Sequence, residues 1–164
     1  MPRETMQKLY VEQLQDLYSA EEQILEALPK MVKKTEHPEL KKAFQEHEMI
    51  TREQVKRLER VFADLGEKPG GHTCKGMKGL IAEGEEVMKE FEDSDVRDAA
   101  MIAAAQRVEH YEIAGYGCAR TYANMLGLDE HAQLLQKTLD EEGRTDHLLT
   151  NLAESVVNLD AMKV

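Results

Sequence analysis

The segment from Ile102 to Leu126, which reads IAAAQRVEHYEIAGYGCARTYANML, decides the fold because an apolar stripe in it has a polar interruption. The stripe keeps the three- and four-residue spacing of one face of an α-helix. Its members are Ile102, Ala105, Tyr116, Ala119, Ala123 and Leu126. Between Ala105 and Tyr116 the same face presents Glu109 and Glu112. The segment predicts a long helix that packs against other helices and carries two carboxylates into the packed face.

Chain breakers divide the rest of the sequence into further helices. His37-Pro38, Gly66, Pro69-Gly70-Gly71 and Gly127 predict boundaries, since proline and glycine end helices. Long helices are expected at about 4–35, 38–65 and 129–159, and a fourth runs to 126 after a cap at Asp95, with Asp98 in its first turn. A shorter helix is expected at about 74–91. The pattern predicts one all-α domain over 1–164, a four-helix bundle with one extra short helix in its central connection.

The other long segments also interrupt their apolar stripes near the middle. The interrupting residues are Glu21 in the first segment, His47, Thr51 and Gln54 in the second, and Glu142 and Asp146 in the last. Antiparallel helices face each other at equal distances from their shared turn. Glu112 and Glu142 each lie 15 residues from Gly127, whereas Glu109 and Asp146 lie 18 and 19 residues from it. Glu21 faces about position 52 across the first turn, so all five acids are expected in one or two layers.

Five carboxylates in one core layer must pair, protonate or bind a cation, because an unpaired buried charge costs several kcal/mol. We expect Glu21, Glu109, Glu112, Glu142 and Asp146 to bind metal, iron or manganese being suited to such oxygen ligands. The rival interpretation is a proton-sharing polar network without metal. His47 lies about five residues, or ~7 Å, from the acid layer. We therefore expect His47, Thr51 and Gln54 to orient the ligands through hydrogen bonds, although each of the three is also ordinary as a satisfied polar core residue.

The composition narrows the choice of partners and location. With 21 Lys plus Arg against 32 Asp plus Glu, the net charge is −11, which argues against nucleic acid as a partner. No apolar run approaches the ~20 residues that span a bilayer, and the N-terminal residues lack the apolar region of a signal peptide. The two cysteines, Cys74 and Cys118, form no C-x-x-C pair. A cytoplasmic protein without a membrane partner is expected.

The short segment at about 74–91 carries an apolar stripe of its own. Its members are Met77, Leu80, Ile81, Met88 and Phe91. The stripe has two interpretations, which are a cap on the bundle and a contact between two copies of the chain.

Four stretches of the sequence resemble the YciE/YciF-type stress-associated ferritin-like proteins. They are YSAEEQ at 18–23, DAAMIAAA at 98–105, VEHYEIA at 108–114, and LDEE at 139–142 with the Thr-Asp pair at 145–146. The resemblance implies a ferritin-like bundle related in shape to rubrerythrin, a homodimer that uses added helices, and a role in the stress response. One departure from the wider di-iron pattern is clear, because no Glu-x-x-His motif occurs in the sequence.

Two functions of different classes follow from these observations. The first is a metal-dependent oxidoreductase, of the di-metal oxidase or peroxidase kind, or an iron-handling protein. The second is a non-catalytic dimeric bundle that keeps a metal-free polar layer and acts through an unidentified protein partner. The missing Glu-x-x-His motif favours the second function, and the buried acids favour the first.

Overall fold

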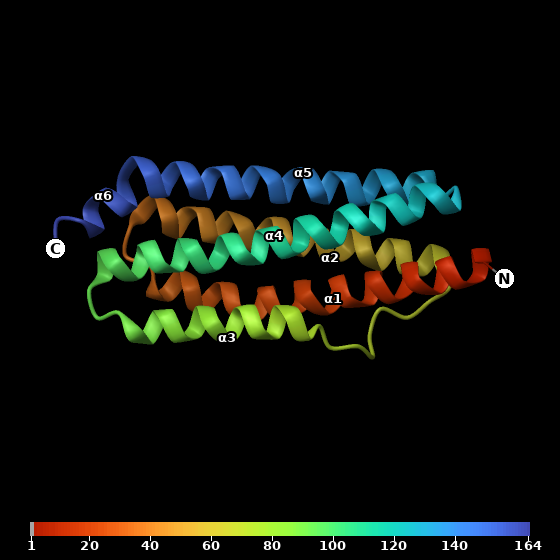
Figure 1. The fold of residues 1–164 in the computed structure, drawn as a ribbon, viewed down its shortest axis with the longest axis horizontal. Helices are drawn as coiled ribbons and strands as arrows, with labels where there is room; N and C mark the ends of the chain where they lie inside the picture. Colours follow the sequence, from red (N-terminus) through yellow and green to blue (C-terminus); the bar gives the residue numbers. More distant parts are fainter. Residues whose placement is uncertain (1) are drawn as a thin grey trace.

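The chain is all-helical over the part described by the computed structural model, residues 2–164, where no strand occurs (Figure 1). The helices are α1 (Pro2–Lys34), α2 (Pro38–Leu65), α3 (Lys75–Glu90), α4 (Ser94–Leu126), α5 (Asp129–Leu152) and α6 (Asn158–Ala161), with a π-helical turn, η1 (Ala153–Val157), between the last two. The predicted all-helical class, the breaks at Pro38 and Gly127 and the short helix in the central connection are confirmed.

The four long helices lie side by side around a common interior. Helix α1 packs against α2 and α4, and α5 packs against α4 and α2 (Figure 1). Helix α3 lies against α1 and α4 on the outside of this group. Residues near the middle of each long helix can therefore meet in the interior.

The start of α4 differs from the sequence prediction. The N-cap of α4 is Asp93, whose Oδ1 accepts from the main-chain N–H groups of Asp95 and Val96 at 2.9 and 3.1 Å, so the predicted cap at Asp95 is wrong. The helix gains its cap two residues earlier because Asp93 has extended backbone angles and a side chain that reaches the free N–H groups of the first turn.

The chain is helical over the predicted range of about 129–159, but it contains a π turn that the sequence does not predict, because α5 gives way to η1 at Ala153. A π turn inserts one residue into the helical register. Ala153 and Val157 are both buried in η1, together with Leu149 and Leu152 in the last turn of α5. The wider turn thus keeps apolar side chains on the core side at the end of the helix.

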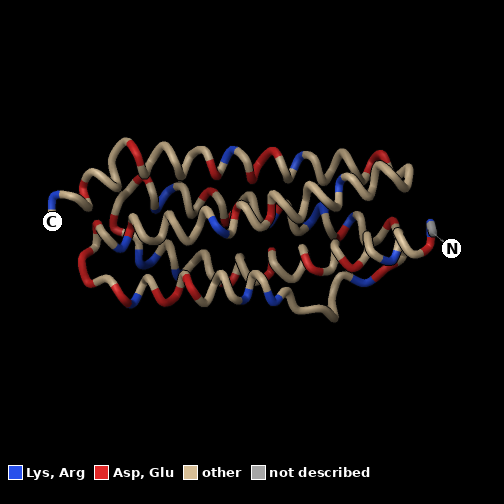
Figure 2. Tube along the Cα trace, viewed as in Figure 1, with Lys and Arg blue, Asp and Glu red and all other residues tan. Residues whose placement is uncertain are grey.

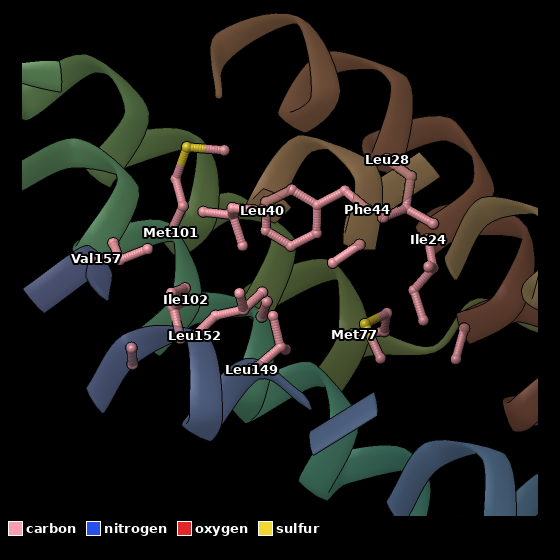
Figure 3. Close-up of a cluster of buried hydrophobic side chains, with 14 of the residues drawn as sticks. Ile24, Leu28, Leu40, Phe44, Met77, Met101, Ile102, Leu149, Leu152 and Val157 are labelled. Atoms are coloured by element: carbon pink, nitrogen blue, oxygen red, sulfur yellow. The ribbon is translucent and has the colours of Figure 1, made fainter. Parts of the chain in front are cut away.

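The apolar core consists of two separate clusters. One contains Ile24, Phe44, Met101 and Leu149 (Figure 3), and the other contains Tyr10, Leu58, Tyr116 and Leu135. In every long helix the residues of the first cluster lie toward one end and those of the second toward the other end. The polar interruptions that the sequence shows fall between the two clusters.

The apolar stripe of α3 faces its own chain. Met77 is fully buried, and Leu80, Ile81 and Met88 pack against the first apolar cluster. Of the two interpretations that the sequence leaves open, the contact with the helical core is the one observed in the single chain.

Charged residues are spread over the surface of the helices. Asp and Glu occur along every long helix, and Lys and Arg are scattered among them rather than gathered on one helix (Figure 2). None of the helices described over 2–164 combines the length and the apolar character that crossing a membrane requires.

Asp98 is expected to be critical for the turn between α1 and α2. Its carboxylate is buried and accepts from the main-chain N–H of His37 at 2.7 Å and of Glu36 at 3.2 Å. Replacing Asp98 with Ala leaves those donors unpaired, which is expected to lower the free energy of unfolding by about 1–3 kcal/mol. Asp95→Ala is the control on the same helix and is expected to cost less than about 1 kcal/mol. Urea denaturation measures both, and equal losses would contradict this role.

Candidate metal centre

Five ligand-competent side chains converge where the two apolar clusters meet. Glu21 comes from α1, His47 from α2, Glu109 and Glu112 from α4, and Glu142 from α5. Glu21, Glu112 and Glu142 are 0% exposed, Glu109 is 2% exposed and His47 is 4% exposed. Every long helix therefore contributes to one buried cluster, which we call the metal cluster.

The metal cluster divides into two groups of potential ligands that share Glu142. In one group, ligand atoms of His47, Glu109 and Glu142 all lie within 4.8 Å of one another. In the other, ligand atoms of Glu21, Glu112 and Glu142 meet the same limit. A carboxylate that belongs to both groups is arranged as a bridging ligand would be between two neighbouring metal ions.

Most of the polar atoms of the metal cluster have no hydrogen-bond partner. The unpartnered buried atoms are Glu21 Oε2, Glu109 Oε2, His47 Nε2 and both carboxylate oxygens of Glu112 and of Glu142. Buried polar groups in proteins are almost always hydrogen-bonded. Such a concentration of unpartnered acceptors indicates a place for cations or for protons.

His47 faces the carboxylates more closely than the sequence predicts. Its Nε2 lies 3.0 Å from Glu109 Oε1 but makes no hydrogen bond there. Its Nδ1 lies 3.5 Å from Thr145 Oγ1, and the Thr145 hydroxyl donates to the Glu141 carbonyl oxygen. With the proton on Nδ1, toward Thr145, the Nε2 lone pair would face the cluster as in a metal-binding histidine, and without metal it would accept the proton of Glu109.

Tyr116 supports the opposite side of the metal cluster. Its phenol is buried and donates to Glu21 Oε1 at 2.6 Å. In the sequence, the spacing of Tyr116 is that of the apolar stripe, which favours a core tyrosine over a redox participant beside a metal. Tyr116 is both a core residue and the hydrogen-bond donor that fixes the Glu21 carboxylate.

The remaining predicted orienting residues lie beside the cluster with different contacts. Gln54 Nε2 donates to Glu141 Oε2 at 3.1 Å, and Glu141 forms a paired contact with Arg57 at 2.6 and 2.7 Å. Thr51 donates to the His47 main-chain carbonyl oxygen at 2.8 Å and so supports its own helix. Arg57 therefore pairs with Glu141, and within residues 3–164 no Lys or Arg is paired with a carboxylate of the metal cluster.

Asp146 does not join the other four predicted acids. Its Oδ2 lies 3.2 Å from Nε2 of the exposed His110, and its Oδ1 accepts from Gln106 Nε2 at 3.3 Å. These two contacts hold the Asp146 carboxylate near the surface. In the interior it is His47, and not Asp146, that faces Glu109. The structure thus brings together Glu21, Glu109, Glu112 and Glu142 and places Asp146 outside their cluster.

Burial perturbs the acidity of all four clustered carboxyls. It raises the pKa of Glu21 to about 8, with the Glu142 charge adding to the rise, and it raises the pKa of Glu109 to about 7. The pKa values of Glu112 and Glu142 lie well above the ordinary range because of burial and then of neighbouring carboxylate charge. Without a cation, the cluster holds protons at neutral pH.

The donor set fits divalent iron or manganese. Carboxylate oxygens with one imidazole nitrogen suit hard or borderline cations. The four carboxylates carry a charge of −4 when ionised, which two divalent cations would neutralise. A site made of Glu21, Glu109, Glu112, Glu142 and His47 can therefore accept two metal ions without leaving buried charge unpaired.

The fold and the site define a class of protein, namely an all-helical protein with a buried cluster of carboxylates and one histidine at its centre. Residues 5–162 match the family described as a domain of unknown function, DUF892. The chain is 43% identical over 162 residues to Protein YciF of Escherichia coli (strain K12), covering 98% of each chain. The chain belongs to the DUF892 family, and the resemblance to YciE/YciF-type proteins is confirmed.

Solved structures share the fold. The crystal structure of the E. coli stress protein YciF superposes with a TM-score of 0.89 at 44% identity, covering 93% of this chain and 97% of that one. The protein YcfI from Rhodopseudomonas palustris gives 0.86 at 41% identity, with coverages of 88% and 92%. A protein from Xanthomonas campestris pv. campestris gives 0.77 at 22% identity, covering 97% of this chain and 99% of that one, and shows the likeness of fold alone.

The metal-free protein is expected to lose stability as the pH rises from about 6 to 9, the range that brackets the raised pKa values of Glu21 and Glu109. An unfolded Glu titrates near about 4.3, so the folded state retains protons that the unfolded chain releases. The stabilisation is complete below that value and is lost as the pH rises through the folded values. Thermal melts with chelator present measure the trend.

Two variants isolate the contribution of the cluster from that of other titrating groups. Glu21→Gln should make the pH dependence shallower, because it removes one raised carboxyl at little change in volume. Glu22→Gln changes the exposed neighbour and should leave the dependence unchanged. A wild-type melting temperature that is constant across this range would mean that the acids do not share a buried cluster.

Proposed function

We propose that this chain is a ferritin-like four-helix-bundle protein of the stress response that binds two iron or manganese ions in its metal cluster. The observation that carries the proposal is the set of buried, unpartnered carboxylate oxygens and the unpartnered His47 Nε2, contributed by all four long helices. The arrangement of α1, α2, α4 and α5 and the E. coli relative's description as a stress protein support the fold and the role.

The residues of the chain have distinct parts in this proposal. His47 and Glu109 bind at one position and Glu21 and Glu112 at the other, while Glu142 serves both. Tyr116 fixes Glu21 by its hydrogen bond, and the two apolar clusters keep bulk water away from the ions. A pair of iron ions supplies one-electron changes suited to reducing peroxide or reacting with dioxygen, so an oxidoreductase or iron-handling role follows.

The alternative is a metal-free polar layer in a non-catalytic protein that acts through a protein partner. One specific observation favours it, because Glu109 and Glu142 are close enough to hydrogen-bond when one of them is protonated, as are Glu21 and Glu112. The absence of a Glu-x-x-His motif points the same way. Metal binding separates the two functions.

The homodimer and the cytoplasmic location remain predictions from the sequence. Homodimer formation would need a surface other than the buried part of the α3 stripe, because Met77, Leu80 and Ile81 pack within one chain. A cytoplasmic location follows from the sequence only.

Added iron(II) or manganese(II) is expected to raise the melting temperature, because the ions bind only the folded state. At a free metal concentration of 100 times Kd, the gain in unfolding free energy is about 2.7 kcal/mol. Glu142→Gln should abolish the gain, since Glu142 belongs to both ligand groups. It should stabilise the metal-free protein only at a pH high enough to ionise the Glu142 carboxyl, because the buried charge that it removes exists only there.

The matched control is Asp146→Asn, one helical turn along α5 from Glu142. Asp146 lies outside the cluster, so this variant should keep the response of the wild-type protein to metal. The same melting temperature with and without metal in the wild-type protein would favour the metal-free alternative.

Metal binding should also release protons, since ligand carboxyls that are protonated at neutral pH must ionise first. Titration calorimetry in two buffers of different ionisation enthalpy counts the protons. The number should be larger at pH 6.5 than at pH 8.5, a range chosen around the raised pKa values of about 7 and 8. Binding of manganese(II) with no proton release at the lower pH would show that the ions bind elsewhere.

A further inference from the structure

An apolar pocket leads from the surface between α1 and α3 to one side of the metal cluster. Its volume is about 50 Å³, and side chains from α1, α2, α3, α4 and α5 line it. The inner wall includes Leu28, Phe44, Met101 and Leu149 of the first apolar cluster (Figure 3). The pocket therefore lies within the core half that adjoins His47 and Glu109.

The floor of the pocket is polar and belongs to the metal cluster. His47, Glu109 and Thr145 line it there. His47 Nε2 and Glu109 Oε2 are buried and have no hydrogen-bond partner. Glu21 and Glu112 do not line the pocket, so it reaches only the ligand group that contains His47.

An exposed ion pair and two small residues lie at the outer end of the pocket. Lys30 Nζ lies 3.4 Å from Glu85 Oε1, and the two side chains are 56% and 40% exposed. An exposed pair of this kind contributes little stability and can open readily. Gly84 and Ala104 leave space beside it, because a Cβ added at Gly84 would lie 3.8 Å from the Ala104 Cβ.

We propose that this pocket binds a small uncharged molecule with a short aliphatic chain and one terminal hydroxyl or hydroperoxyl group, which hydrogen-bonds to Glu109 or His47 at the floor. Binding does not require metal, whereas a role as the substrate site of the metal cluster rests on the proposed function.

Three observations define this ligand class. The wall between the Lys30–Glu85 pair and the floor is apolar, so an anionic ligand would lose its hydration there and would then meet the Glu109 carboxylate. Among the described lining residues, the polar ones at the inner end are His47, Glu109 and Thr145, which suits a ligand with a single polar terminus. A cavity volume of about 10–15 Å³, defined in the same way as the volume of this pocket, is enough for one water molecule. A volume of about 50 Å³ therefore admits a chain of a few carbon atoms.

The test titrates metal-free protein with n-butanol and follows side-chain methyl signals by NMR. Signals of Met101, Ala105 and Leu149 should shift together and saturate, because these residues line the pocket. Butyrate, which carries a negative charge on the same chain, should produce no such saturation, because its carboxylate would meet the acidic groups at the floor. Comparable binding of butyrate, or no saturable shift with n-butanol, would overturn the proposal.

Two glycine variants of α3 supply a matched comparison. Gly84→Leu should weaken n-butanol binding by at least about tenfold, because the new side chain starts at the pocket wall. Gly79→Leu makes the same change on the exposed face of that helix, where a Cβ meets nothing within 4 Å, and should leave binding unchanged. Equal affinities in the two variants would contradict the assignment.

A second pair of variants tests the pocket independently, in case Gly84→Leu does not fold. Ala104→Leu fills the pocket from α4 and should also weaken binding, whereas Ala103→Leu lies on the exposed side and should not. Cooperative thermal melts establish that each variant is folded. Binding that survives in both Gly84→Leu and Ala104→Leu would place n-butanol elsewhere.

The alcohol and the hydroperoxide are distinguished in protein loaded with iron(II). n-Butyl hydroperoxide should oxidise two iron(II) ions per molecule, consuming two protons and releasing n-butanol and water. Saturable n-butanol binding without this oxidation assigns the pocket to the alcohol. Saturable binding without any metal stabilisation means that the proposed metal function fails while the pocket assignment holds.

Discussion

Four glutamates and one histidine are buried together in an otherwise apolar interior, and the packing of the long helices must accommodate their charge. Each carboxylate that leaves water unpaired costs several kcal/mol. Glu21, Glu109, Glu112 and Glu142 are nonetheless almost completely buried. The helices hold these groups together by packing an apolar cluster on each side of them. The interior is therefore arranged around a charge that must be neutralised by protons or by cations.

The two ways of neutralising this charge have different consequences. Protons neutralise it one carboxyl at a time and give the raised pKa values of Glu21 and Glu109. Divalent cations neutralise it in pairs and require the carboxyls to ionise. The position of Glu142, common to both ligand groups, is explained directly by a pair of cations, whereas proton sharing needs only pairs of neighbouring carboxyls. The free Nε2 of His47, facing Glu109, adds a ligand that is not an acid.

The sequence predicts most of the fold and part of the site. Proline, glycine and stripe spacing predict the helices, and counting residues from Gly127 predicts that Glu112 and Glu142 lie at one depth. Counting residues from the turns predicts that Asp146 joins the acids and that His47 lies apart from them, and the structure shows the reverse. Counting locates main-chain positions and not the direction of side chains. Glu109 lies one turn from Glu112 toward the α1–α2 turn, where His47 also lies, and Asp146 finds hydrogen-bonding partners at the surface. The π turn at η1 and the cap at Asp93 depend on packing and local geometry that apolar spacing does not encode.

Elemental analysis of protein purified without chelator and without an affinity-tag metal shows whether the buried carboxylates hold cations. About two iron or manganese ions are expected per chain, one for each ligand group that shares Glu142, and the Glu142→Gln variant should lose them. Wild-type protein that contains no such metal, or a Glu142→Gln variant that retains the same metal content, would contradict the proposed metal binding.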